Sequence, residues 1–172
     1  GTITLTSDGT NYEITQDGAT YAYVANAAGG VVNASAVSIT RGTTTSALST
    51  VNSDDSSRWT LTSSKSGTNY QNDWTYSYTL PTTTPGAITV AWNSKNSTSS
   101  AMKTYLYNYQ TAKWDSVGSA TVGTTEDTLT WSASAPTAYV STTGAVKVRF
   151  VGPQSTKSYT SYTDAAWLVW EP

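Results

Sequence analysis

Residues 101–114 read AMKTYLYNYQTAKW, and this stretch decides the fold class. Its side chains alternate, so that Leu106 falls on one face while Tyr105 and Tyr107 fall on the other, which is the period of a β-strand. The polar run NYQTA then breaks the alternation, and a second strand begins next to Trp114. The stretch therefore predicts a β-hairpin whose Leu106 faces the core.

Strand signals of the same kind recur along the whole chain. Thr, Val, Tyr and Trp favour a pleated surface, and Gly, Asn, Asp and Pro divide them into runs spaced by about 8–12 residues. We expect strands at 3–6, 12–16, 20–26, 36–40, 58–63, 73–80, 87–93, 101–109, 113–121, 127–132, 145–151 and 164–170. No window shows a sustained apolar period of 3.6, so helix is a minor component. This spacing is typical of an antiparallel β-sandwich or barrel.

The domain organisation follows from length and from one glycine-rich junction. A chain of 172 residues is expected to form a single domain. The sequence Ala-Ala-Gly-Gly at 27–30 is a candidate boundary. The segment 1–30 is either a set of extra strands of the same domain or the remnant of a preceding module, and we favour the first. We therefore expect one module over 1–172.

Composition excludes several classes of function. The chain has no Cys and no His, which removes disulfide scaffolds, thiol nucleophiles, Ser-His-Asp triads and imidazole metal ligands. A formal net charge of −2 argues against a nucleic-acid partner, and the lack of a long apolar run argues against a membrane span. Few groups titrate near neutrality without Cys and His, so stability is expected to be flat between about pH 6 and 8.

Several motifs together resemble a known family. They are SDDSSRW at 53–59, an acidic turn entering a strand; ITVAWNSKNS at 88–97, a strand and turn; YLYNYQTAKW at 105–114, a hairpin; and VKVRF at 146–150 with YTDAAWL at 162–168, the last two strands. Asn93-Ser94 stands where the family usually has an acidic residue and Gly. From about residue 33 to the end, the chain resembles the galactose-binding-like carbohydrate-binding modules of secreted bacterial polysaccharide-degrading enzymes.

The resemblance implies a fold, a partner and a location. It implies an all-β antiparallel β-sandwich (jelly roll) that binds a polysaccharide or oligosaccharide as a monomeric, non-catalytic module of a larger secreted enzyme. No pair of acids stands in a setting recognisable for glycoside hydrolysis, so we do not expect an enzyme. The alternative is a structural or adhesive β-sandwich without a sugar site, which the low charge and abundant Ser and Thr fit equally. Burial of Trp167, Trp74 and Tyr105 together would favour that alternative.

The aromatic candidates for sugar binding follow from strand parity. In the last strand Leu168 and Trp170 take the inward positions, so Trp167 faces outward as a stacking platform, unless the N-terminal segment covers it. Tyr105 and Tyr109 share an outward face, either as a ligand surface or as cross-strand packing. Trp74 and Tyr76 share a face with Tyr78 and Leu80, which we expect to be buried. Trp74 and Tyr76 are kept as ligand candidates because Trp74 lies nearer the loop end.

The polar candidates are two cations and three acids. Lys147 and Arg149 alternate with apolar residues and point outward, where a guanidinium can bind sugar hydroxyls or a carboxylate, or simply be solvated. Asp54, Asp55 and Asp164 offer hard oxygen ligands for a structural calcium ion. The alternative for the adjacent pair is capping of backbone N–H groups at a turn. We expect no other cofactor.

Overall fold

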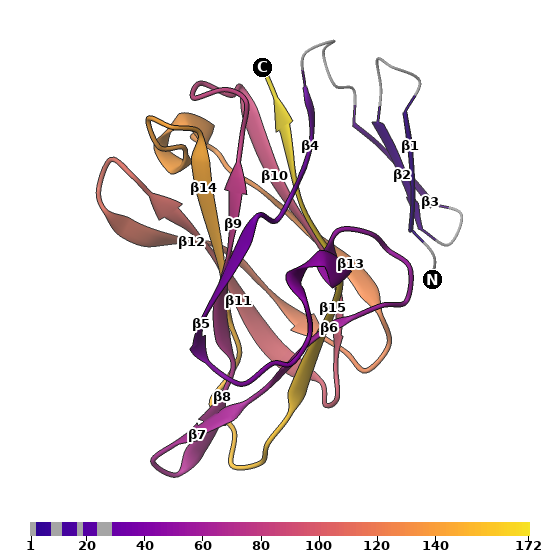
Figure 1. Ribbon diagram of the computed structural model, residues 1–172, viewed down its shortest axis with the longest axis vertical. Coiled ribbons are helices and arrows are strands. Elements are labelled where there is room, and N and C mark those ends of the chain that lie inside the picture. Colours follow the sequence, from indigo (N-terminus) through magenta and orange to yellow (C-terminus); the bar gives the residue numbers. More distant parts are fainter. Residues whose placement is uncertain (1–2, 8–11, 17–18, 24–28) are drawn as a thin grey trace.

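Two five-stranded antiparallel sheets contain most of the strands from residue 30 onward (Figure 1). The computed structural model describes residues 3–7, 12–16, 19–23 and 29–172. Its strands are β1 (Ile3–Ser7), β2 (Tyr12–Gln16), β3 (Ala19–Tyr23), β4 (Gly30–Asn33), β5 (Ala36–Arg41), β6 (Trp59–Thr62), β7 (Ser64–Ser66), β8 (Asn69–Gln71), β9 (Asp73–Thr79), β10 (Ala87–Asn96), β11 (Ser100–Asn108), β12 (Lys113–Val122), β13 (Asp127–Ser132), β14 (Ala145–Val151) and β15 (Thr160–Glu171). The two short 3₁₀ helices are η1 (Leu48–Val51) and η2 (Pro136–Tyr139).

The strand order defines the two layers. One sheet has the order β12-β11-β14-β9-β5. The other has the order β13-β10-β15-β4, with β6 also pairing with β15. β7 and β8 form a small hairpin of their own. The expected antiparallel β-sandwich is confirmed, and no helix in the described part of the chain is long and apolar enough to cross a membrane.

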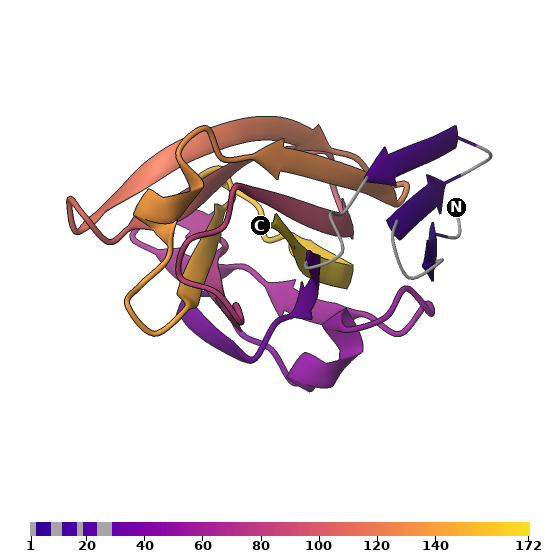
Figure 2. The same cartoon turned by 90° about the horizontal axis from the view of Figure 1, so that it is seen from above.

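The first three strands form a separate sheet. β1 pairs with β2 and β2 with β3, both antiparallel. Figures 1 and 2 both show this sheet beside the two larger ones. Within the described residues, β1–β3 hydrogen-bond as strands only with one another. The last part of the strand expected at 20–26, and residues 27–28 of the candidate boundary, lie outside the described residues.

The core between the two large sheets is unusually rich in aromatic rings. Trp59, Trp74, Tyr76, Trp92 and Phe150 are fully buried. The ring centres of Trp92 and Phe150 are 4.4 Å apart, and those of Trp74 and Phe150 are 5.4 Å apart and stacked. These rings come from both sheets, so their packing holds the two layers together. The burial expected for Tyr78 and Leu80 is confirmed.

Two β-bulges change the direction of side chains near the candidate sites. Asn93 pairs with Ala165 and Ser94 with Thr163, which leaves Asp164 as an extra residue in β15. Between β11 and β12, Tyr105 pairs with Ser116 although the preceding pair is Thr104 with Gly118. A bulge bends its strand and redirects the side chains around it.

Every strand expected from the sequence coincides with an observed one, but three short strands were missed. β4, β7 and β8 span three or four residues each, which is too few to show a period. β15 also begins earlier than expected, at Thr160, because its first residues are polar and pair with β6.

Candidate functional site

The outward side chains of the β12-β11-β14-β9-β5 sheet form three rows across its strands. We call this surface the aromatic-cationic face. Its rows, taken from β12 or β11 toward β5, are Trp114, Tyr107, Lys147, Ser77 and Ala36; then Ser116, Tyr105, Arg149, Thr75 and Ser38; then Lys103, Val151, Asp73 and Arg41. The alternate residues of the same strands, such as Leu106, Val148 and Trp74, are buried in the core.

Aromatic rings gather at the β11–β12 edge of this face. The ring centre of Tyr107 lies 5.2 Å from that of Trp114, with an angle of 70° between the planes. Tyr109, just beyond the end of β11, is 5.0 Å from Tyr107 at 84°. The three rings are half-buried and meet edge to face, the arrangement that aromatic quadrupoles favour. Burial raises the pKa of Tyr109, so its hydroxyl stays neutral.

The two cations of β14 lie next to these rings. Lys147 Nζ is 5.4 Å from the centre of the Tyr107 ring, and Arg149 Cζ is 5.7 Å from that of Trp114. Arg149 Nε and Nη2 donate to the two carboxylate oxygens of Asp73, at 2.7 and 2.5 Å. Because Asp73 is 4% exposed, this bidentate pair fixes the guanidinium on the face. Three N–H donors of Arg149 remain outside the Asp73 pair.

The structure brings together four of the residues predicted for sugar binding. Tyr105, Tyr109, Lys147 and Arg149 all belong to the aromatic-cationic face or its edge. Tyr107 was predicted to face outward but was not predicted as a ligand residue, and Trp114 and Asp73 were not predicted at all. The hairpin register carried the signal for Trp114, because Tyr107 and Trp114 are direct cross-strand partners.

The exposure predicted for Trp167 is wrong. The side chain points in the predicted direction, away from the core that contains Leu168. The outer face of that sheet is covered at this point, and the indole is 6% exposed. Its Nε1–H donates to the carbonyl of Asn52, 3.2 Å away, and it packs with Ala91, Ala165 and Val31. β15 also lies in the other sheet, so Trp167 does not share a face with Tyr105 or Arg149.

Trp74 and Tyr76 are also corrected as ligand candidates. Both side chains are fully buried in the core, against Trp59 and Phe150. A ring in that position has no face free to stack on a ligand. Of the three rings whose burial discriminates a sugar site from a purely structural sandwich, only Tyr105 is half-exposed. The aromatic-cationic face therefore replaces Trp167 and Trp74 as the candidate site.

A second feature is a group of carboxylates on the other sheet. Oxygens of Asp54, Glu126 and Asp164 all lie within 4.8 Å of one another. The Arg58 guanidinium pairs with Glu126 and lies 3.9 Å from Asp164. Glu126 was missed by the sequence analysis, because it comes from a turn far away in the chain. Asp55 is not a member.

Asp55 instead stabilises its own turn. Its carboxylate accepts the backbone N–H of Ser57 at 2.9 Å and the hydroxyl of Ser53 at 2.8 Å. The hydrogen bond from Ser57, followed by that from Ser53, lowers the pKa of Asp55. The turn-capping alternative therefore describes Asp55 and replaces its assignment as a metal ligand.

Two members of this cluster of carboxylates, Asp164 and Glu126, have pKa values shifted in opposite directions. Burial, together with the neighbouring Glu126, raises the pKa of Asp164 to about 7. Burial also opposes ionisation of Glu126, but the hydrogen bond and charge of Arg58 outweigh it and lower the pKa of Glu126. The backbone N–H groups of Asp55 and Ser56 point at the Asp164 oxygens, at 3.4 and 3.2 Å. Composition alone predicts that stability is flat near neutral pH. The pKa of Asp164, about 7, places a titrating group inside that range.

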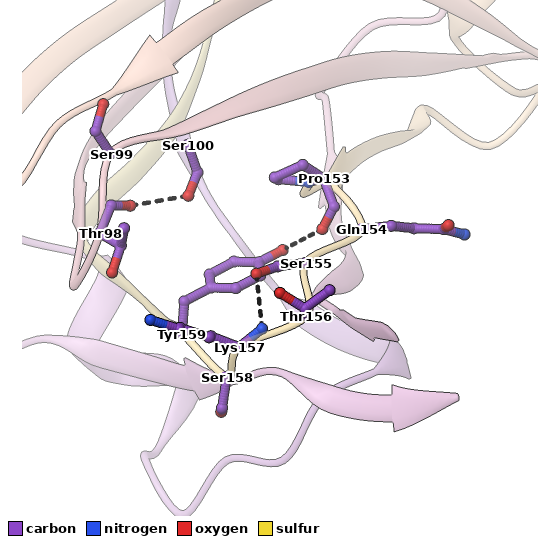
Figure 3. Close-up of a pocket in the computed structure, with 10 residues that line it drawn as sticks. All are labelled: Thr98, Ser99, Ser100, Pro153, Gln154, Ser155, Thr156, Lys157, Ser158 and Tyr159. Carbon is purple, nitrogen blue, oxygen red and sulfur yellow. Dashed lines mark hydrogen bonds between the residues drawn. The ribbon is translucent and has the colours of Figure 1, made fainter. Parts of the chain in front are cut away.

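A pocket of about 530 Å³ opens between the β10–β11 turn and the β14–β15 loop (Figure 3). It is lined by Thr98, Ser99, Ser100, Pro153, Gln154, Ser155, Thr156, Lys157, Ser158 and Tyr159. In Figure 3 the Tyr159 ring lies between the two segments, and its hydroxyl donates to the Pro153 carbonyl at 3.0 Å. Tyr159 is 4% exposed, so the pocket offers small polar groups but no open ring face. The aromatic-cationic face is the better equipped of the two sites.

The part of the chain that forms the sandwich matches the model of a protein family. Residues 30–166 match the family model described as Domain of unknown function (DUF8815). The chain belongs to this family. The DUF8815 match begins at the first residue of β4 and ends within β15, so it spans both large sheets and leaves out β1–β3. No curated protein matches the sequence.

Solved structures show what the DUF8815 fold is similar to. TmCBM61 in complex with β-1,4-galactotriose is 12% identical, with a TM-score of 0.51 over 79% of this chain and 88% of that one. A mutant of CBM29-2 complexed with mannohexaose is 8% identical, with a TM-score of 0.51 over 82% of this chain and 92% of that one. At such identities the likeness concerns the fold alone. It confirms the predicted jelly-roll fold of the carbohydrate-binding-module type.

Proposed function

We propose that this DUF8815 domain binds a polysaccharide or oligosaccharide on its aromatic-cationic face and does not cleave it. The observation that carries the proposal is the packing of Tyr107 and Trp114 beside the cations Lys147 and Arg149, all on one sheet surface. The likeness in fold to carbohydrate-binding modules supports the proposal without deciding it.

The face offers both kinds of contact that a sugar ring needs. A pyranose has an apolar C–H side, which packs on aromatic rings, and a rim of hydroxyls, which need hydrogen-bonding partners. Tyr105 and Tyr107 supply ring surface, and Ser77 and the remaining N–H groups of Arg149 supply donors and acceptors. All of these side chains stand on paired strands, so little ordering is required on binding.

The same face is poorly suited to glycoside hydrolysis. That reaction ordinarily uses two carboxyl groups on either side of the scissile bond, about 5–10 Å apart. Asp73 is the one carboxylate in the three rows, and both of its oxygens accept hydrogen bonds from Arg149. Asp115, between Trp114 and Ser116, pairs instead with Asn108 and Tyr139. Binding without catalysis is therefore the proposal.

The wider context belongs to the proposal as well. A shallow, solvated face gives weak binding on its own, because displaced water must be replaced by equally good contacts. Such a module is useful when it is tethered to an enzyme, since the tether keeps the enzyme at high local concentration on its polymer. We propose that the chain works as a monomeric module of a secreted bacterial protein of this kind.

Affinity electrophoresis against a panel of polysaccharides tests the proposal. We expect at least one polymer to retard the wild-type protein and Tyr107→Ala to weaken that binding about tenfold or more, as truncation of an aromatic anchor does. Tyr162→Ala is the matched control, because Tyr162 also lies under a lysine, with Lys95 Nζ 5.9 Å away, but on the other sheet. Unchanged migration of the wild type on every polymer would contradict the proposal.

We further propose that Asp54, Glu126 and Asp164 hold a structural calcium ion. The donor set fits, because carboxylate oxygens from three separate segments converge and Ca²⁺ prefers such hard ligands. Burial, followed by the neighbouring Glu126, raises the pKa of Asp164, and a bound cation would favour its charged form. Calcium should raise the melting temperature and a chelator should lower it again, because an ion bound only to the folded state stabilises it by mass action. Identical melting with and without chelator would rule the ion out.

A further inference from the structure

We infer that the ligand of the aromatic-cationic face is an acidic polysaccharide, one that carries carboxylate groups. The inference rests on the proposed function and specifies its ligand class. Its basis is the distribution of charge. The whole chain has a formal net charge of −2 and nine Lys and Arg residues, yet Arg41, Lys103, Lys147 and Arg149 all lie on this one face.

The positive charges of the face are largely uncompensated. Asp73 is the single carboxylate in the rows, and Arg149 engages it completely. Among the described residues, Arg41, Lys103 and Lys147 form no ion pair. Arg58, on the other sheet, contrasts with them because two carboxylates surround its guanidinium. The face therefore presents three cations that lack an anionic partner within the described chain.

The placement of these cations suits an extended anion better than a single ion. Lys103 and Arg41 stand in one row on β11 and β5, with two strands between them, which places their backbones about 14 Å apart. Lys147 lies four residues along β14 from that row, about 13 Å away. Cations spread at these distances do not converge on one small anion. They match charges repeated along a polymer that crosses the face.

The rings favour a sugar over a nucleic acid as the carrier of these charges. Single-stranded nucleic acid is bound by successive open ring faces on which bases stack. Tyr107 stands at 70° to Trp114 and 84° to Tyr109, and Arg149 lies over Trp114, so the rings form a corner and not a row of parallel platforms. A corner of rings bordered by cations fits a hydroxylated ring that bears an acidic group.

Titration calorimetry with polymers matched in backbone and different in charge tests the inference. The pairs are mannan with polymannuronate, and hydroxyethyl cellulose with carboxymethyl cellulose. We expect tighter binding to the charged member of at least one pair, with affinity that falls as NaCl is raised. Lys147→Gln and Lys103→Gln should each weaken that binding about threefold or more, while Lys95→Gln on the opposite sheet leaves it unchanged. Melting curves confirm that each variant is folded.

The outcomes separate the two claims. Binding to neutral polymers that equals binding to charged ones, with no effect of the lysine substitutions, overturns the inference and leaves the proposed function standing. Failure to bind every polymer overturns both. Binding to polyuridylate that depends on Lys147, without binding to any polyuronate, also overturns both and makes the face a nucleic-acid site.

Discussion

Replacing Trp167 by Ala should destabilise the protein strongly without acting through the ligand face. The indole is 6% exposed, packs with Ala91, Ala165 and Val31, and donates its Nε1–H to the Asn52 carbonyl. Truncation of a buried Trp leaves a cavity and typically costs about 3–5 kcal/mol. Loss of the donor also leaves the Asn52 carbonyl without this partner, which adds to the cost.

This magnitude is large enough to measure in two ways. For a domain of this size, 1 kcal/mol corresponds to about 2–4 °C in melting temperature, so Trp167→Ala should melt about 6–20 °C below the wild type. Urea unfolding gives the free energy independently through the transition midpoint. Trp114→Ala is the comparison, because that ring is half-buried on the aromatic-cationic face and should cost no more than about 2 kcal/mol. If Trp167→Ala unfolds within about 1 kcal/mol of the wild type, the burial argument fails.

Two further predictions concern charged groups. Asp164 has a pKa of about 7 in the folded protein and titrates near 3.9 when unfolded, so its protonation favours folding. That contribution is complete below about pH 4 and is lost as the pH rises to about 7, so in chelator the urea midpoint should fall between pH 5 and 8. Asp164→Asn should remove this fall, and an equally steep profile in the variant would refute the assignment. Arg149→Ala should lower the free energy of unfolding by about 1.5–3 kcal/mol, because it leaves buried Asp73 without its charged donor. Asp73→Asn combined with Arg149→Ala should recover part of that loss, and a double variant no more stable than Arg149→Ala would argue against the pair.

Local patterns were enough to predict most of the sandwich. The alternation in 101–109 and 145–151 placed Leu106 and Val148 inward and Tyr105, Lys147 and Arg149 outward, and the structure agrees. Side-chain direction alternates along a regular strand, so away from bulges it can be determined from sequence. The hairpin register likewise contained the Tyr107–Trp114 pair.

The alternation of side chains along a strand does not predict which other segments pack over an outward-facing residue. Trp167 points outward as predicted, but the segment around Asn52 covers it and Val31 of the neighbouring strand β4 packs against it, and neither contact is local in sequence. The order of strands in the sheets has the same limitation, because parity alone does not say that Trp167 and Arg149 belong to different sheets. Glu126 was missed because long-range pairing brings its turn to Asp164, and no motif near residue 126 signals that meeting.

The most direct test of the ligand face is the ¹H–¹⁵N spectrum of the indole groups during titration with an oligosaccharide cut from a polymer that the protein binds. The seven Trp residues are spread over the core, the outer side of β15 and the aromatic-cationic face. The account predicts that the Trp114 indole resonance shifts progressively with ligand, while those of Trp167 and Trp74 stay in place. A titration that moves the Trp167 resonance and leaves Trp114 unchanged would contradict it.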